Sequence, residues 1–197
     1  TQTLSNKTFT SPLFQGAIDG WISANESWSY ASPTTIKVPS GAASKYKKGD
    51  KIKLTQTTVK YFSVVGVADT VLTITGGASY TLTNAAITSP YYSHIENPIG
   101  FPGYFSMGTP TWTTTETPFT NQPTTNTFRM RISGSKCKIN YTVGTHAISG
   151  GTGVFIATFA AGIMPPIGDG AGSCTNVNIP VSGFSTTSTA IPNAIRF

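Results

Sequence analysis

Apolar and polar side chains alternate at every second position in several segments of this chain. In residues 51–56, for example, Ile52 and Leu54 alternate with Lys51 and Lys53. This period of two places neighbouring side chains on opposite faces of a β-strand. No segment sustains the 3.6-residue period of an amphipathic helix, and Gly or Pro interrupts nearly every window that could hold one. The pattern therefore predicts an all-β fold with almost no helix.

The composition favours the same fold class. Only 10% of the 197 residues are charged, and β-branched and aromatic residues carry most of the apolar content. A chain of this length can hold one good-sized domain or two small ones, each with its own core. No apolar run reaches the length of a membrane-spanning helix. We therefore expect a soluble protein without membrane insertion.

The first half predicts a small antiparallel β-barrel. Gly49-Asp50 forms a turn, and a single turn of helix fits residues 42–46. Short strands at hairpin spacing are typical of such a barrel. We assign residues 1–105 to this module, including a short N-terminal arm. The expected strands are residues 36–38, 51–56, 59–65, 71–75 and 80–82.

The second half predicts a β-sandwich that resembles a jelly roll, over residues 106–197. Residues 128–132 and 137–143 alternate cleanly on either side of Ser133-Gly-Ser135, which indicates a hairpin. Residues 154–161 are nearly all apolar, as expected for a strand buried on both faces. Residues 177–181 contain a proline, which edge strands tolerate.

An aromatic, proline-rich connector separates the two halves, between residues 95 and 122. Its rings need burial, so we expect it to pack against a neighbour rather than to move freely. It carries more ring surface than two small domains readily cover. Its aromatic side chains are therefore candidates for a subunit interface: Phe101, Tyr104, Phe105 and Trp112.

A lysine-rich stretch, residues 45–54, raises the question of nucleic-acid binding. Five of the chain's 13 basic side chains fall within it, and the formal net charge is +6. The alternation places Lys51 and Lys53 on the face opposite Ile52 and Leu54, so we expect the lysines to be exposed and structurally peripheral. Exposed lysines also discourage unwanted strand pairing. No nucleic-acid partner is predicted.

A second basic cluster is predicted on the hairpin of the second half. If Gly134-Ser135 is a two-residue loop, Arg131 lies directly opposite Lys138, with Arg129 and Lys136 on the same outer face. Like charges opposite each other are destabilising. A neighbouring subunit, or an anionic ligand such as an acidic glycan, would relieve the repulsion, although solvent screening is the simpler account. These four residues form the candidate basic face.

The pattern of a catalytic or metal site is not found. The chain has seven acids, and no two lie close enough in sequence to form a glycosidase-type pair. His94 and Glu96, His146 and Gly168-Asp-Gly170 fit turns better than catalytic or metal motifs. We therefore expect no enzyme activity, cofactor or metal. Cys137 and Cys174 fit buried thiols, and whether they pair stays open.

Several segments of the first half resemble a β-module that recurs in structural proteins of tailed bacteriophages. The second half is more loosely similar to the β-sandwich that often follows this module, through Phe128-Arg-Met-Arg-Ile-Ser-Gly134 and Ile139-Asn-Tyr-Thr-Val-Gly-Thr145. The most specific match is Lys47-Lys-Gly-Asp-Lys-Ile-Lys-Leu-Thr-Gln56. The others are Asp19-Gly-Trp-Ile22, Thr34-Thr-Ile-Lys-Val-Pro39, Thr58-Val-Lys-Tyr-Phe62, Tyr80-Thr-Leu-Thr-Asn-Ala-Ala-Ile87 and Asn97-Pro-Ile-Gly-Phe-Pro102.

The resemblance implies a structural protein of the virion, assembled in the cytoplasm of a bacterial host. Its expected place is the tail, a fibre or another surface component, with a role in particle assembly or host adsorption. It brings no catalytic residues. Together with the connector and the basic face, it predicts a closed homo-oligomer, with a trimer favoured, that binds other virion proteins.

A carbohydrate-binding adhesin is the alternative from a different class. In that interpretation Trp21, Trp28 and Trp112 are exposed and stack on sugar rings of a host surface glycan. A capsid decoration protein and a glycan-cleaving enzyme rank lower, the enzyme because acids are so few.

Overall fold

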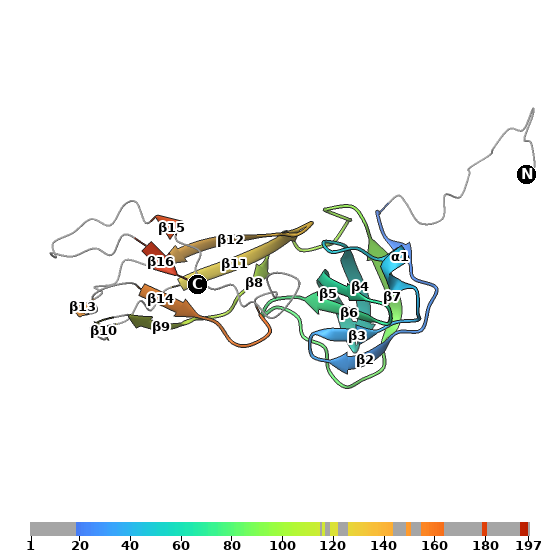
Figure 1. Cartoon of the computed structure of the whole chain (residues 1–197), viewed down its shortest axis with the longest axis horizontal. Helices are drawn as coiled ribbons and strands as arrows, with labels where there is room; N and C mark the ends of the chain where they lie inside the picture. The colour runs from blue at the N-terminus through green and yellow to red at the C-terminus, as the bar shows by residue number, and fades with distance from the viewer. Residues whose placement is uncertain are drawn as a thin grey trace, which may run out of the picture.

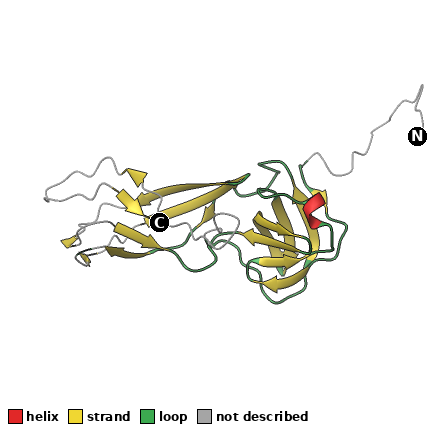
Figure 2. Ribbon diagram, in the orientation of Figure 1, coloured by secondary structure: helices red, strands yellow, loops and turns green. Residues whose placement is uncertain are grey.

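The computed structural model describes residues 19–114, 116, 119–121, 126–143, 149–150, 155–163, 179–180 and 194–196. The all-β prediction is confirmed, since strands form most of the regular structure (Figure 2). Within the described residues the single helix is α1 (Ala42–Lys45), at the predicted place. No described helix is long and apolar enough to cross a membrane.

Figure 1 shows two lobes lying end to end along the long axis. We call described residues 19–104 the first lobe and described residues from 105 onward the second lobe. Each lobe contains a cluster of buried hydrophobic side chains. The predicted domain boundary between residues 105 and 106 stays a prediction.

The first lobe is built on a seven-stranded antiparallel sheet with the order β1-β7-β4-β5-β6-β3-β2. The described pairings end at β1 and β2, so closure of this sheet into a barrel stays a prediction. The strands are β1 (Ile22–Ser23), β2 (Ser29–Ser32), β3 (Thr35–Lys37), β4 (Lys51–Gln56), β5 (Thr58–Ala68), β6 (Val71–Thr75) and β7 (Thr88–Ser93).

One predicted strand of the first lobe is wrong, and one observed strand was missed. Residues 80–82 do not form a strand, because Tyr80 only bridges back to Gly76 and turns its ring toward Phe105 of the second lobe. In the sheet β6 pairs with β3 instead, and the missed strand β7 pairs with β4 and β1. Strand β7 contains Pro90, and the pairing of β7 with β4 shifts register beside this residue. The ladder therefore tolerates the missing N–H donor.

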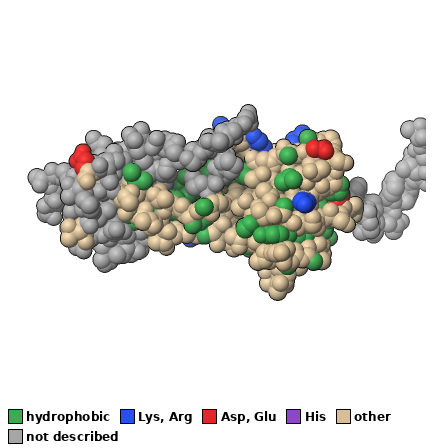
Figure 3. Space-filling model, turned by 60° about the horizontal axis from the view of Figure 1, so that its bottom comes forward, with side chains coloured by type: hydrophobic (Ala, Val, Ile, Leu, Met, Phe, Trp, Pro, Cys, Tyr) green, Lys and Arg blue, Asp and Glu red, His purple; other side chains and the backbone are tan. Residues whose placement is uncertain are grey.

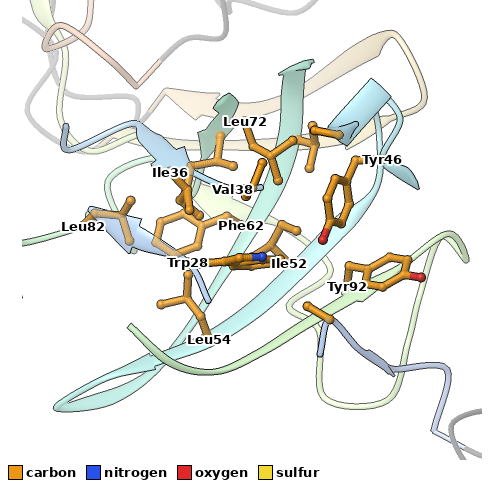
Figure 4. Close-up of a cluster of buried hydrophobic side chains, with 14 residues drawn as sticks. Trp28, Ile36, Val38, Tyr46, Ile52, Leu54, Phe62, Leu72, Leu82 and Tyr92 are labelled. Carbon is orange, nitrogen blue, oxygen red and sulfur yellow. The ribbon is translucent and has the colours of Figure 1, made fainter. Parts of the chain in front are cut away.

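The core of the first lobe explains the alternation in β4. Ile52 and Leu54 are fully buried and meet Phe62 of β5 and Leu72 of β6 (Figure 4). The indole of Trp28 lies among these side chains. Burying each large apolar side chain contributes roughly 1.5–3 kcal/mol, so this face fixes the register of the strand.

The second lobe contains three smaller sheets, with the orders β12-β11-β8, β15-β16-β14-β9 and β10-β13. Its buried cluster includes Phe105, Trp112, Phe128 and Met130, so its β-sandwich-like character agrees with the prediction. The strands are β8 (Phe105–Ser106), β9 (Thr111–Thr114), β10 (Phe119–Asn121), β11 (Asn126–Ser133), β12 (Lys136–Val143), β13 (Ser149–Gly150), β14 (Phe155–Thr158), β15 (Ile179–Pro180) and β16 (Ala194–Arg196).

The β11–β12 hairpin has its predicted register, although both strands are longer than the predicted residues 128–132 and 137–143. Ser133 pairs with Lys136 across a Gly134-Ser135 loop, which places Arg131 opposite Lys138. Strand β15 is an edge strand, as its proline indicated. The expectation of a strand buried on both faces is wrong for β14, because Ala157 is buried whereas Thr158 is exposed. One face of that strand packs on the core and the other meets solvent.

Candidate functional site at the junction of the lobes

Lys51, the first residue of β4, is buried between the two lobes. Its side chain is 1% exposed, and its Nζ donates hydrogen bonds to the carbonyl oxygens of Gly49 at 2.8 Å and Ile132 at 2.7 Å. The Glu96 carboxylate lies 3.5 Å from the same nitrogen. The prediction that Lys51 is exposed and peripheral is therefore wrong. The face opposite Ile52 does point away from the first core, but the tip of the β11–β12 hairpin covers it.

The neighbours of Lys51 across the sheet are buried in the same way. Ser63 of β5 and Ser93 of β7 pair with Lys51, and both are fully buried. The Ser63 hydroxyl has no hydrogen-bond partner within the described structure. Three polar side chains that are neighbours across the sheet, Lys51, Ser63 and Ser93, are thus buried. Burial of polar groups costs free energy unless they form hydrogen bonds. Lys51 forms them with the backbone of both lobes.

Burial lowers the pKa of the Lys51 ammonium, because an apolar environment disfavours the charged form. The Glu96 carboxylate acts in the opposite direction and partly offsets this effect. The two carbonyl acceptors also suit a protonated amine, which has donors only. The junction therefore holds a buried cation that joins β4 to the hairpin.

Glu96 also binds Arg131, the neighbour of Ile132 in β11. Arg131 Nε donates to Glu96 Oε1 at 3.1 Å, and its Nη2 donates to Asn97 Oδ1 at 3.0 Å. Arg131 therefore needs no neighbouring subunit or anionic ligand to neutralise it, because an acid of the first lobe pairs with it. Sequence reasoning missed the pair, since nothing in the local pattern relates residues 35 positions apart.

A close approach of two glycines completes this contact. Gly49 has φ +97°, and a Cβ placed on it would lie 2.5 Å from Gly134 Cα in the hairpin loop. Any larger residue at position 49 would push the two backbones apart. We define the junction as Gly49, Lys51 and Glu96 of the first lobe together with Arg131, Ile132 and Gly134 of the second.

Two further contacts fix the lobes to each other. Ala78 N donates to Ser106 O at 2.7 Å, and Thr75 Oγ1 donates to Ile163 O at 3.1 Å. Beside these polar contacts, the ring of Tyr80 meets both Tyr61 and Phe105, with centroids 5.9 and 6.1 Å apart. Aromatic packing therefore runs without a break from one lobe into the other.

The other lysines of the stretch have three different environments. Lys45 forms an ion pair with Glu26, and Lys53 is half-buried, its Nζ lying 4.7 Å from the Trp21 ring and 4.5 Å from the Tyr91 ring. Lys47 and Lys48 are exposed. Only these last two fit the predicted exposure. On the face shown in Figure 3, the described charged side chains are few and scattered.

Three of the four candidate interface aromatics are covered by the chain itself. Phe105 and Trp112 are 1% and 3% exposed, and Phe101 is half-buried against Trp21, Tyr61 and Phe105. The expectation that the connector packs against a neighbour is confirmed for these rings. Of the four candidate interface aromatics, only Tyr104 is exposed, with 41% of its surface accessible. The argument for a subunit interface from exposed rings therefore applies to Tyr104 alone.

The tryptophans proposed for sugar stacking are all buried. Trp21 and Trp28 are 2% and 5% exposed, and Trp112 belongs to the second core. Trp21 Nε1 also donates to Ile99 O at 2.8 Å. The hypothesis that these rings stack on a glycan is therefore wrong for this fold. A large aromatic ring fits a core as well as it fits a sugar-binding surface, so the size of these side chains did not predict their exposure.

The remaining candidates are placed as follows. Arg129, Lys136 and Lys138 are exposed on the outer face of the hairpin, as predicted. His94 Nδ1 lies 3.0 Å from Asp50 Oδ1, and no group of three potential metal ligands occurs among the described residues. Cys137 is half-buried. His146, residues 168–170 and Cys174 lie outside the described residues.

No family model, curated protein or solved structure matches this chain.

Proposed function

We propose that this chain is a structural protein of a bacteriophage virion, in the tail, a fibre or another surface component. The observation that carries the proposal is the fixed junction, in which a buried lysine and a continuous aromatic cluster hold the two lobes together. Interfaces between domains usually permit relative motion unless they are large and apolar. A particle component that must keep its shape between two neighbours needs such a fixed connection.

The likeness of residues 47–56 to phage β-modules supports the same proposal from an independent direction. These residues include Gly49 and Lys51, which make the contact with the second lobe. The most specific part of the resemblance thus also contributes to the junction between the lobes.

The proposed assembly is a closed homo-oligomer, with a trimer favoured. This oligomer contacts other virion proteins. The exposed apolar side chains on the loop before the second lobe are the best place for a subunit contact. Ile95, Ile99 and Tyr104 are 53%, 69% and 41% exposed. Light scattering on the purified chain should give three times the monomer mass, and a Tyr104→Ser, Ile99→Ser variant should give a lower mass. A wild-type monomer that also occurs as isolated copies on particles would overturn this assembly.

Mass spectrometry and cryo-electron microscopy of purified particles test the virion proposal. The chain should be present in a fixed number of copies per particle, and density of two end-to-end lobes should occupy symmetric positions. Particles from a strain with the coding region deleted provide the control and should lack this density. Absence of the chain from wild-type particles would refute the proposal.

A carbohydrate-binding module is the second candidate. Burial of the three tryptophans removes its first structural basis. A polar groove on the outer face of the β11–β12 hairpin still favours carbohydrate binding, through Arg129 and Asn140 instead of tryptophan rings.

A further inference from the structure

A shallow groove lies on the β11–β12 hairpin of the second lobe. Its volume is about 290 Å³, just below the usual range of ligand pockets. Arg129 is directly opposite Asn140, and Thr127 is directly opposite Thr142, so these side chains share the outer face. The groove is lined by Thr127, Arg129, Asn140, Tyr141 and Thr142.

The positive charge of this groove is not neutralised within the described residues. Arg129 is exposed and forms no ion pair there, whereas Arg131, two residues further on the same face, is held by Glu96. Lys138 stands opposite Arg131, and Lys136 lies two residues before it in β12; both lysines are exposed. The part of the basic face that can attract an anion is therefore Arg129 with the two lysines.

We propose that this groove binds an acidic polysaccharide through the carboxylate of a uronic-acid residue. The Arg129 guanidinium presents two parallel N–H donors that match a carboxylate. The Asn140 amide and the hydroxyls of Thr127 and Thr142 supply donors and acceptors for sugar hydroxyls. A polymer with repeated carboxylates can continue along the hairpin to Lys138 and Lys136.

The outward side chains of the hairpin favour such a ligand over a nucleic acid. Proteins that bind single-stranded nucleic acids combine a basic groove with aromatic rings on which the bases stack. The described outer face of β11 and β12 carries no aromatic side chain, because Tyr141 points inward and stacks on Phe128 with an interplanar angle of 14°. The outer-face residues are Thr127, Arg129, Arg131, Ser133, Lys136, Lys138, Asn140 and Thr142.

Titration calorimetry of the full chain with polygalacturonate tests the proposal. The matched ligand control is the same polymer with its carboxylates reduced to alcohols, which keeps the sugar hydroxyls. We expect wild-type protein to bind the acidic polymer and to bind the reduced polymer at least tenfold more weakly. Equal binding to both polymers, or no binding to the acidic one at millimolar uronate, would overturn the proposal.

Variants locate the site. Arg129→Gln should weaken binding at least tenfold, and Arg129→Lys should also weaken it, since lysine keeps the charge but loses the paired donors. Lys138→Gln should weaken binding two- to fivefold. Lys37→Gln, which removes an exposed charge from β3 in the first lobe, is the control and should leave binding unchanged. Thermal unfolding checks that each variant is folded.

Two results would place the binding elsewhere or change its class. If Arg129→Gln and Lys37→Gln weaken binding equally, the attraction comes from net charge and the groove is not a site. If a single-stranded DNA oligonucleotide binds more tightly than polygalacturonate and loses affinity in Arg129→Gln, the face binds nucleic acid. The inference does not rest on the virion proposal, because binding by the isolated chain is measured independently of particle composition.

Discussion

The lysine-rich stretch of the first lobe and the hairpin of the second lobe are both basic, but the fold uses their charges differently. In the stretch, Lys45 pairs with Glu26 and Lys51 is buried in the junction. On the hairpin, Arg129 and Lys138 are exposed without an ion pair in the described structure. The denser cluster in the sequence is therefore the poorer candidate for binding an external anion.

The charges differ in exposure because different parts of the chain pack against the two basic segments. Lys51 begins β4, at the end of the strand that the hairpin tip reaches, so the second lobe covers it. The loop that carries Glu96 and Asn97 bonds to Arg131 on the hairpin. Arg129 lies two residues earlier in β11, or roughly 7 Å away, and forms no hydrogen bond or ion pair with this loop in the described structure. A separation of two residues in β11 thus distinguishes Arg131, which is neutralised by Glu96, from Arg129, which can bind an external anion.

The largest expected effect comes from removing the buried charge. Lys51→Met keeps the length of the side chain but leaves the carbonyls of Gly49 and Ile132 without their donor. We expect a loss of about 3–4 kcal/mol in the free energy of unfolding. Urea unfolding followed by tryptophan fluorescence measures it, because Trp21 and Trp28 report on the first lobe and Trp112 on the second.

The matched control for this variant is Lys47→Met, which makes the same change at an exposed lysine of the same stretch. It should change the free energy of unfolding by less than about 0.5 kcal/mol. Equal effects of the two substitutions would show that Lys51 does not hold the lobes together.

The next effect separates backbone strain from contact between the lobes. Gly49 and Gly134 both have positive φ, but an added Cβ meets backbone only at Gly49. Gly134→Ala should cost about 1 kcal/mol from strain alone, and Gly49→Ala about 2–3 kcal/mol because the hairpin must also move. Urea unfolding of both variants gives the difference, and similar losses would indicate that the two turns are not in contact.

A smaller effect is expected from the two arginines of the hairpin. Arg131→Gln loses its bonds to Glu96 and Asn97, which are partly exposed, and should cost at most about 1 kcal/mol. Arg129→Gln should change the free energy of unfolding by less than about 0.5 kcal/mol. Thermal unfolding at low and at moderate salt measures both. A larger loss in Arg129→Gln than in Arg131→Gln would reverse the comparison drawn above.

The smallest effect concerns pH and the ion pair of Lys45. Burial would raise the pKa of Glu26, but hydrogen bonds from Lys45, Tyr46 and Trp28 outweigh it and hold the pKa below its ordinary value of 4.5. The folded protein therefore gains stability from this carboxylate above pH 4.5 and loses it as the pH falls through the lowered pKa.

The test is Glu26→Gln, which should cost less than about 1 kcal/mol at pH 7. The difference in unfolding free energy between wild type and variant should shrink below pH 4.5. Urea unfolding at several pH values measures it, and a difference that grows on acidification would contradict the assigned direction of the pKa shift.

Much of the local structure could be predicted from the sequence. Strands β4 and β6 have their predicted bounds, and a two-residue loop was enough to place Arg131 opposite Lys138. These features depend on side-chain period and turn length, which act over a few residues. Strand β7 was missed, because its pairing depends on a register shift in β4 that no local pattern reveals.

The candidate sites could be predicted only in part. Exposure of Arg129 and Lys138 followed from the alternation of β11 and β12, since no other part of the described chain covers these two side chains. Burial of the three tryptophans did not follow from any pattern, because a large aromatic ring fits a core as well as a binding surface.

By itself the sequence determined the all-β class, the hairpin and its register, and which side chains leave the strands on the face away from Ile52 and Leu54. Only the tertiary structure decided what that face meets. Lys51 is buried because the hairpin of the second lobe lies over it, and Arg131 is neutralised because Glu96 arrives from 35 residues away. The periodicity of a strand defines two faces, but burial and charge pairing depend on the surfaces that long-range contacts bring to each face.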